Sequence, residues 1–217
     1  MSIRLEVWGD YACFSRPEMK VERVSYDVMT PSAARGLVEA IFWHPGLRWH
    51  IDRIHVCNPI RFASIRRNEI KCKASASNMR TAMTRGGPLY IAAPAHVQQR
   101  ASLVLTDVRY VIEAHFTMTE KAAAGDNPGK FQDMATRRMR RGQCYHQPCF
   151  GCREFPASFA LFQGEAVDTD DSLKGEKDLG FMLYDMDYSD PADIRPLFFR
   201  AQLRDGVMNL RDCEVIG

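Results

Sequence analysis

The strongest structural signal in the sequence is an alternating run of side chains between Val108 and Thr119. Apolar residues occupy every second position from Val108 to Met118, and mostly polar residues, Glu113 and His115 among them, lie between. A period of two residues is typical of a β-strand whose two faces have different surroundings. This run therefore predicts the clearest strand of the chain.

A strand, a helix and another strand are predicted before this run. Alternation over residues 3–7 indicates a half-buried strand. Thr30 is a suitable N-cap and Pro31 a suitable first helical residue, and the apolar positions that follow have helical spacing. Pro45-Gly46 is expected to end this helix, and a strand is expected from His50 to Cys57. This order is how a ferredoxin-like or RNA-recognition-motif fold begins.

The rest of the chain is predicted to contain a basic insertion, a helix and a β-rich end. Residues 61–100 are rich in Lys and Arg and are punctuated by Ser, Asn, Gly and Pro, which favours a flexible hairpin or loop. A helix is expected after Asn127-Pro128, with Gly142 at its end. Strands are expected at 158–162, 181–188 and 197–203, followed by a hairpin turn at Asp205-Gly206.

Charge is distributed unevenly along the 217 residues. Residues 165–193 hold ten acidic residues and only two lysines, so the formal net charge of +2 conceals a basic body before them. This asymmetry indicates a polyanionic partner on one face, although charges that only solvate a surface would look the same. The sequence has no apolar run of 18 residues and no signal-peptide pattern, so we expect a cytoplasmic protein without membrane contact.

The most basic segment lies on the helix predicted after Pro128. Four arginines occur within residues 137–141, where like charges three and four positions apart repel one another. An anionic partner such as RNA would relieve this repulsion, and each phosphate contact would make binding sensitive to salt. The alternative is an arginine-rich face that contacts only solvent.

Cysteines and histidines are the other candidates for chemistry. Cys149 and Cys152 form a Cys-x-x-Cys pair close to Cys144 and His146, which are residue types that bind zinc. No second pair follows, so free thiols in a reducing compartment are favoured and no metal site is expected. His115 shares a strand face with Glu113, which predicts a surface pair. Motifs for nucleotide hydrolysis or a dinucleotide cofactor are missing from the sequence, and no cofactor is expected.

Several stretches together resemble one known family. They are residues 8–14 (WGDYACF) with 16–17 (RP), residues 25–36 (SYDVMTPSAARG), residues 39–45 (EAIFWHP) and residues 151–157 (GCREFPA). The chain is similar over nearly its whole length to family-five CRISPR-associated (Cas) proteins of the type I-C (Dvulg) subtype, in the repeat-associated RNA-binding superfamily.

The resemblance implies an α+β fold and a division of the chain. Residues 1–120 would form a ferredoxin-like, RNA-recognition-type domain with the basic hairpin inserted. Residues 121–157 would form the basic helix and a connecting loop, and residues 158–217 a small antiparallel β-sheet domain.

The resemblance also implies metal-independent cleavage of precursor CRISPR RNA at the base of the repeat hairpin, with retention of the 5′ handle in the surveillance complex. The expected partners are the repeat RNA and the backbone (family seven) and large (family eight) Cas subunits. Non-specific binding of duplex DNA is a further expectation.

The family's cleavage site maps onto three positions of this sequence, and only one of them keeps the family residue. Lys130 is retained, whereas Phe42 replaces a tyrosine and Phe131 replaces a histidine. A phenyl ring cannot exchange a proton, and losing one general acid or base typically costs roughly 10²–10⁴-fold in rate. His44, Tyr145 and His146 are the candidates that could compensate. Arginines and lysines are expected to bind the RNA, namely Arg16, Lys20, Arg35, Arg66, Arg67, Lys71, Lys73, Arg137, Arg138, Arg140 and Arg141.

Three functions remain open from the sequence. The first is an active repeat endoribonuclease that uses the ribose 2′-OH as nucleophile and leaves a 2′,3′-cyclic phosphate and a 5′-OH. The second is a non-catalytic subunit that binds the RNA handle, which Phe42 and Phe131 favour. The third is a cysteine-ligated zinc protein.

Overall fold

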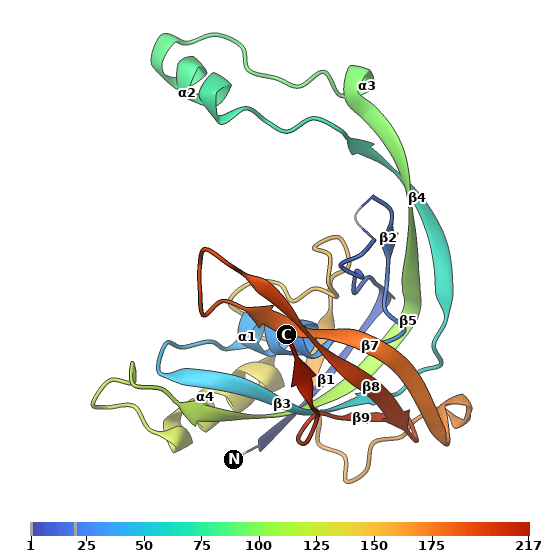
Figure 1. Ribbon diagram of the computed structural model, residues 1–217. Coiled ribbons are helices and arrows are strands. Elements are labelled where there is room, and N and C mark those ends of the chain that lie inside the picture. The colour runs from blue at the N-terminus through green and yellow to red at the C-terminus, as the bar shows by residue number, and fades with distance from the viewer. Residues whose placement is uncertain (1, 20) are drawn as a thin grey trace.

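The computed structural model describes residues 2–19 and 21–217 and shows an α+β protein built on one large, mainly antiparallel sheet (Figure 1). The sheet order is β10-β8-β9-β3-β5-β1-β6, with β2 and β4 also paired to β5, and β7 paired to β8. The strands are β1 (Ser2–Ala12), β2 (Arg23–Val24), β3 (Leu47–Val56), β4 (Phe62–Ile70), β5 (Val97–Met118), β6 (Ser158–Leu161), β7 (Glu176–Asp187), β8 (Arg195–Arg204), β9 (Val207–Asn209) and β10 (Val215–Ile216). The helices are α1 (Pro31–Ile41), α2 (Ala76–Arg85), α3 (Ala93–His96) and α4 (Pro128–Arg141), with a short 3-10 turn at Asp171–Leu173.

The alternating run is confirmed as the central strand of this sheet. β5 pairs with β1 and β3 on its two sides, and its first half pairs with β4. It starts at Val97, eleven residues before the alternation begins. The first part was not predicted because residues 97–101 are exposed or half-buried, and the buried residues that follow, Ser102, Val104 and Leu105, do not alternate regularly.

α1 begins as predicted but ends early. The Thr30 side chain accepts a hydrogen bond from the Ala33 N–H at 3.3 Å, and Pro31 is the first helical residue. The helix ends at Ile41, because Phe42 is extended (φ −146°, ψ 114°) while its N–H still bonds to the Val38 carbonyl. The expected helix end at Pro45 was therefore wrong, and residues 42–44 leave the helix.

The core lies between the sheet and the two helices α1 and α4. Trp49 of β3 and Phe116 of β5 meet edge to face at 5.2 Å, and Phe116 contacts Phe131 of α4 at 6.3 Å. The Trp49 indole N–H donates to the Phe42 carbonyl at 2.8 Å, which ties β3 to the chain leaving α1. The helices thus cover one face of β3 and β5, and residues of opposite parity form the other face.

Residues 61–100 form an arm rather than an irregular loop. Phe62–Ile70 pairs in register with Val97–Leu105, and this hairpin leaves the body of the molecule with α2 at its far end (Figure 1). The predicted hairpin is confirmed, but the predicted irregularity was wrong for β4 and α2. Ser75 caps α2, yet none of its residues is buried. Among the described residues, no helix is both long and apolar enough to cross a membrane.

The C-terminal strands join the same sheet. β7 and β8 form a long hairpin, and the predicted turn at Asp205-Gly206 is confirmed, with φ values of 50° and 77°. β9 then pairs with β3 opposite Arg53 to His55, so hydrogen bonds connect the last strands to the first part of the chain. The boundaries at residues 120 and 157 stay a prediction.

Candidate functional site

The three positions expected to form the cleavage site lie together where α1 ends and α4 begins. The Phe131 ring lies 6.0 Å from the Phe42 ring and 4.8 Å from the His44 ring. Lys130 precedes Phe131 in the first turn of α4, whose N-cap is Asn127. The chain leaves the helix at Phe42, and the His44 ring packs against Phe131 of α4.

Phe42 and Phe131 are core residues. Their exposed fractions are 2% and 1%, and both belong to the main hydrophobic cluster. They therefore hold the end of α1 against the start of α4, but they offer no proton and no exposed surface to a phosphate.

Lys130 presents a cation that is already paired. Its Nζ donates to Asp126 Oδ1 at 2.9 Å, and its own backbone N–H donates to the Asn127 side chain at 2.9 Å. The hydrogen bond from Lys130, with one from the Ala123 N–H, lowers the pKa of Asp126, so this carboxylate keeps its charge. The Lys130 side chain is about half exposed, and its ammonium can reach a phosphate as well.

His44 is oriented by its own loop. Its Nδ1 accepts a hydrogen bond from the Gly46 N–H at 3.0 Å and lies 4.0 Å from Asp126 Oδ2. A neutral ring with an acceptor at Nδ1 carries its proton on Nε2. The neutral side chain is therefore arranged to donate a hydrogen bond, and to act as a base it would have to give up the Gly46 contact.

Tyr145 and His146 lie against the end of α1. Their backbone N–H groups both donate to the Ala40 carbonyl, at 2.8 and 3.4 Å, and their rings meet edge to face at 5.5 Å. The segment therefore folds back from α4 as expected. The role of these two side chains in proton transfer stays a prediction.

The basic helix α4 divides its arginines between structure and surface. Arg138 donates to the Ile41 carbonyl at 2.9 Å and lies over the Phe42 ring at 5.6 Å. Arg137, Arg140 and Arg141 are exposed, and Gly142 ends the helix in the left-handed conformation, as predicted. Three arginines of α4 are thus open to a polyanion.

RNA binding by this helix predicts a specific change in salt dependence. Arg137→Ala together with Arg141→Ala should reduce the slope of log K against log salt by about one to two, because each lost phosphate contact removes about 0.7–0.9. Repeat-RNA affinity measured by fluorescence anisotropy across a salt series checks this. Arg200→Ala with Arg204→Ala, two exposed arginines of β8 paired to Asp178 and Glu176, is the matched control. An unchanged slope in the α4 variant would contradict the assignment.

Other basic residues expected at the RNA are partly engaged within the protein. Arg35 bonds to both oxygens of Asp185 at 2.8 and 2.7 Å, which uses part of the acidic segment to hold β7 against α1. Arg16 lies over the Tyr26 ring at 4.5 Å, and Arg67 pairs with Glu154. Arg66, Lys71 and Lys73 are exposed on the arm. Lys20 lies outside the described residues, and RNA contacts by all of these stay predictions.

Two further expectations concern metal ligands and His115. Within residues 2–19 and 21–217, no three His, Cys, Asp or Glu side chains are grouped as a metal site.

His115 does not pair with Glu113: its Nδ1 bonds to Asp52, while Glu113 bonds to His55 at 3.1 Å. The expected His115–Glu113 pair was wrong because the partners come from the neighbouring strand, which the pattern of one strand cannot reveal.

Comparisons with known proteins agree over the whole chain. The model of the family described as CRISPR-associated protein (Cas_Cas5) matches residues 2–211. A Mannheimia succiniciproducens protein named CRISPR pre-crRNA endoribonuclease Cas5d is 51% identical over 218 residues, covering 96% of this chain and 94% of that protein. A protein of the same name from Thermus thermophilus is 40% identical over 221 residues, covering 94% and 89%.

Solved structures show the same fold. The structure titled "Crystal Structure of CRISPR-associated Protein" superposes with a TM-score of 0.71 at 21% identity, covering 100% of this chain and 97% of that one. The resemblance found in the sequence motifs is confirmed by the family match and by relatives well above 30% identity. This chain therefore belongs to the Cas5d family of CRISPR-associated proteins.

Proposed function

We propose that this protein is an endoribonuclease that cuts precursor CRISPR RNA at each repeat and stays bound to the 5′ handle. The observation that carries the proposal is the 51% identity, over nearly all of both chains, to a protein named CRISPR pre-crRNA endoribonuclease. The exposed cations of α4, Lys130 in its first turn and Arg137, Arg140 and Arg141 in its second half, support it, because they give an RNA backbone a place to bind.

The proposed reaction is an internal transesterification without a metal ion. The ribose 2′-OH loses its proton and attacks the adjacent phosphorus, the bond to the 5′-oxygen breaks, and that oxygen takes up a proton. The products are a 2′,3′-cyclic phosphate and a 5′-OH. Lys130 is the proposed residue for stabilising negative charge on bound phosphate, since its ammonium is exposed beside Asp126.

The proposed architecture places RNA on a ferredoxin-like domain. The order β1, α1, β3, with β5 between β1 and β3, supports such a domain in residues 1–120, followed by a smaller sheet domain after residue 157. The repeat hairpin would be bound through its A-form shape and its unpaired flanking bases. Family-seven and family-eight Cas subunits are the proposed protein partners.

A second function, binding of the handle without cleavage, is favoured by one observation. The two side chains that replace the family's tyrosine and histidine are buried phenylalanines. If no other residues supplied proton transfer, the protein would bind repeat RNA without cutting it.

Cleavage in excess EDTA separates these two functions. We expect the purified protein to cut its cognate repeat RNA once at the hairpin base, leaving a cyclic phosphate, and to leave an RNA with a 2′-deoxyribose at that position intact. Lys130→Ala should lower the rate about tenfold at limiting RNA, the effect of losing roughly 1.4 kcal/mol of phosphate contact. Lys174→Ala, whose lysine pairs with Asp171 on the surface, should match the wild type. Tight binding with no cut would favour the second function.

A further inference from the structure

A β-bulge places an acidic side chain on the sheet face that α1 and α4 do not cover. The register between β3 and β5 shifts between Ile51 and Arg53, so Asp52 is the extra residue of β3. His50 faces His115 across the two strands. Their neighbours Trp49 and Phe116 point into the core, so the histidines lie on the opposite face. Bulges commonly re-aim a side chain next to an active site.

Asp52 holds His115 in a fixed orientation. Its carboxylate is 6% exposed and accepts a hydrogen bond from His115 Nδ1 at 3.0 Å to each oxygen, and another from Arg211 Nε at 3.3 Å. The His115 side chain is 40% exposed. Because Asp52 occupies Nδ1, Nε2 is the nitrogen of His115 that remains for a substrate.

His50 lies against this oriented ring. The two imidazoles stack with their centroids 5.0 Å apart and their planes 16° from parallel. His50 Nε2 bonds to Thr117 Oγ1 at 2.9 Å, and if it donates there, Nδ1 is left as a free acceptor. Burial, then the neighbouring His115 and Arg48, lower the pKa of His50, so its ring is neutral at neutral pH.

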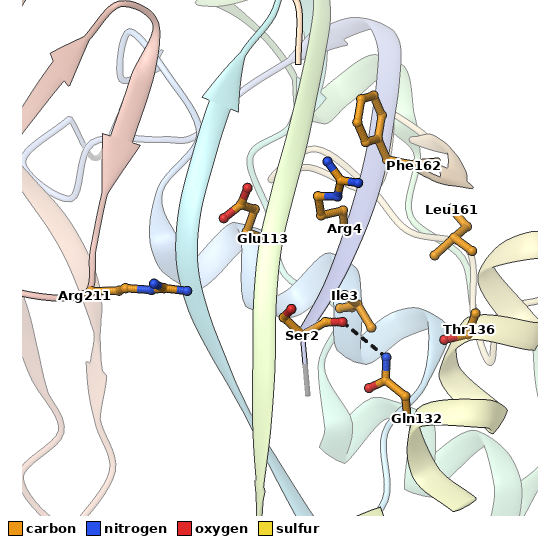
Figure 2. A pocket seen from close by; sticks show the side chains of 9 residues that line it. All are labelled: Ser2, Ile3, Arg4, Glu113, Gln132, Thr136, Leu161, Phe162 and Arg211. Atoms are coloured by element: carbon orange, nitrogen blue, oxygen red, sulfur yellow. Dashed lines mark hydrogen bonds between the residues drawn. The ribbon is translucent and has the colours of Figure 1, made fainter. Parts of the chain in front are cut away.

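His50 lines a cavity of about 580 Å³ together with Arg35 and Arg48. A second cavity of about 470 Å³ lies along β1 and β5, and neither histidine is part of its wall (Figure 2). Ser2, which is opposite His115 in the β1–β5 register, lies at its wall, and Arg4 and Glu113 face it from neighbouring strands. Figure 2 shows Arg211 reaching towards these residues from the other side of β3. Both volumes are within the range of small-ligand sites, and each cavity has two arginines that suit a phosphate, so nucleotides of one RNA strand can bind on either side of the histidine pair.

We propose that His50 and His115, held by Asp52, are the acid–base pair that cleaves RNA bound across the uncovered face of the sheet. This inference rests on the proposed endoribonuclease function and names its catalytic residues. A structural ion pair between Asp52 and Arg211 would need neither the stacked second imidazole nor an open Nε2 on an exposed ring.

The proton transfers balance with these two residues. Neutral His50 takes the proton of the ribose 2′-OH at Nδ1, and the 2′-oxygen forms a bond to phosphorus. The bond from phosphorus to the 5′-oxygen breaks, and protonated His115 gives its Nε2 proton to that leaving oxygen. The pair ends with the protonation states exchanged, and proton exchange with water restores them.

If the histidine pair transfers the protons, Lys130 contributes by binding the RNA. It lies on the side of the sheet that carries Phe116 and Phe131, whereas the histidine pair lies on the other side. The His50–His115 pair is three positions from the Leu47–Met118 end of β3 and β5, about 10 Å along the strands. An RNA that passes around this end reaches both sides of the sheet.

Single-turnover cleavage at saturating repeat RNA in EDTA tests the assignment. His115→Asn keeps a donor for Asp52, and His50→Gln keeps a donor for Thr117, so both variants should fold. Each should cut at least 100-fold more slowly than the wild type and bind RNA within about twofold. His55→Gln, on the same face and bonded to Glu113, is the matched control and should cut at the wild-type rate.

Two results would overturn the inference. One of them leaves the proposed endoribonuclease function in place, and the other removes it as well. Wild-type rates in both histidine variants would return catalysis to the α4 side and leave the endoribonuclease function intact. A wild-type protein that binds the repeat but never cuts it would remove the proposed function together with the pair.

The pH profile supplies a readout that a structural role would not change. Cleavage should fall on the acid side as His50 is protonated, at a pH below the usual 6.5 of histidine, because its pKa is lowered. His50→Gln should lose this limb, and Arg48→Ala should move it to higher pH because a neighbouring positive charge is removed.

The charged or titratable groups around His50 are Arg48, Asp52, His115 and Arg211, with Arg35, Asp185 and Asp187 across a cavity. An acid limb that survives in His50→Gln would contradict the role as base.

Discussion

Phe131→Ala is expected to lower the free energy of unfolding by about 3–5 kcal/mol, the range for removing a buried phenyl ring. Phe131 is fully enclosed and its ring contacts those of Phe42, His44 and Phe116. Its loss leaves a cavity at the point where α4, the end of α1 and the sheet meet. Urea unfolding followed by circular dichroism measures the change.

The same experiment separates a structural role for Phe131 from a surface one. Met134→Ala, on the same helix but only half-buried, is the control and should cost clearly less. A loss below about 1 kcal/mol for Phe131→Ala would mean that the side chain is not enclosed as described, and that a ligand could reach it.

Gly151→Ala is expected to be the second large effect, at about 2–5 kcal/mol. Gly151 has a φ of +80°, where a side chain costs about 1–2 kcal/mol, and an added Cβ would lie 2.0 Å from the Cys13 carbonyl oxygen. The backbone must shift to relieve that overlap, which adds roughly 1–3 kcal/mol. The glycine thus allows the segment after α4 to pack directly on the end of β1.

Gly175→Ala isolates the part of this effect that comes from contact. Gly175 has a φ of +85°, but an added Cβ would meet nothing within 4 Å. Thermal and urea unfolding of the two variants should therefore differ by the cost of the Cys13 overlap. Equal stability of the two variants would show that residue 151 does not approach Cys13 so closely.

Local structure was predictable from the sequence where one short segment determines it. The Thr30-Pro31 start of α1, the helix entry at Asn127-Pro128, the Gly142 end of α4 and the Asp205-Gly206 turn are all as expected. Each depends on a few neighbouring residues whose backbone preferences agree. The end of α1 was misplaced because Trp49 and Phe131 fix the backbone of residues 42–44 through contacts that are distant in the sequence.

The regular strand pairing of the arm and the histidine pair were not predictable for a related reason. β4 has no buried face, so its pairing with β5 leaves no apolar period to detect. Asp52 becomes a partner of His115 only because the bulge turns it towards β5, and bulges have no reliable sequence signature when no glycine marks them. Resemblance to the family correctly placed Phe42, Lys130 and Phe131 together, but it could not show that both phenylalanines are buried.

The position of β5 also determines when the protein can fold during synthesis. In the described residues, the first strand in the sequence with which β1, β2, β3 and β4 can pair is β5. Their other partners, β6 for β1 and β9 for β3, come later in the sequence. The strands before residue 97 therefore leave the ribosome ahead of their partner β5. Distant pairing of this kind slows folding, and unpaired strand edges invite association with other chains. The nascent chain is thus open to such association until residue 118 has emerged.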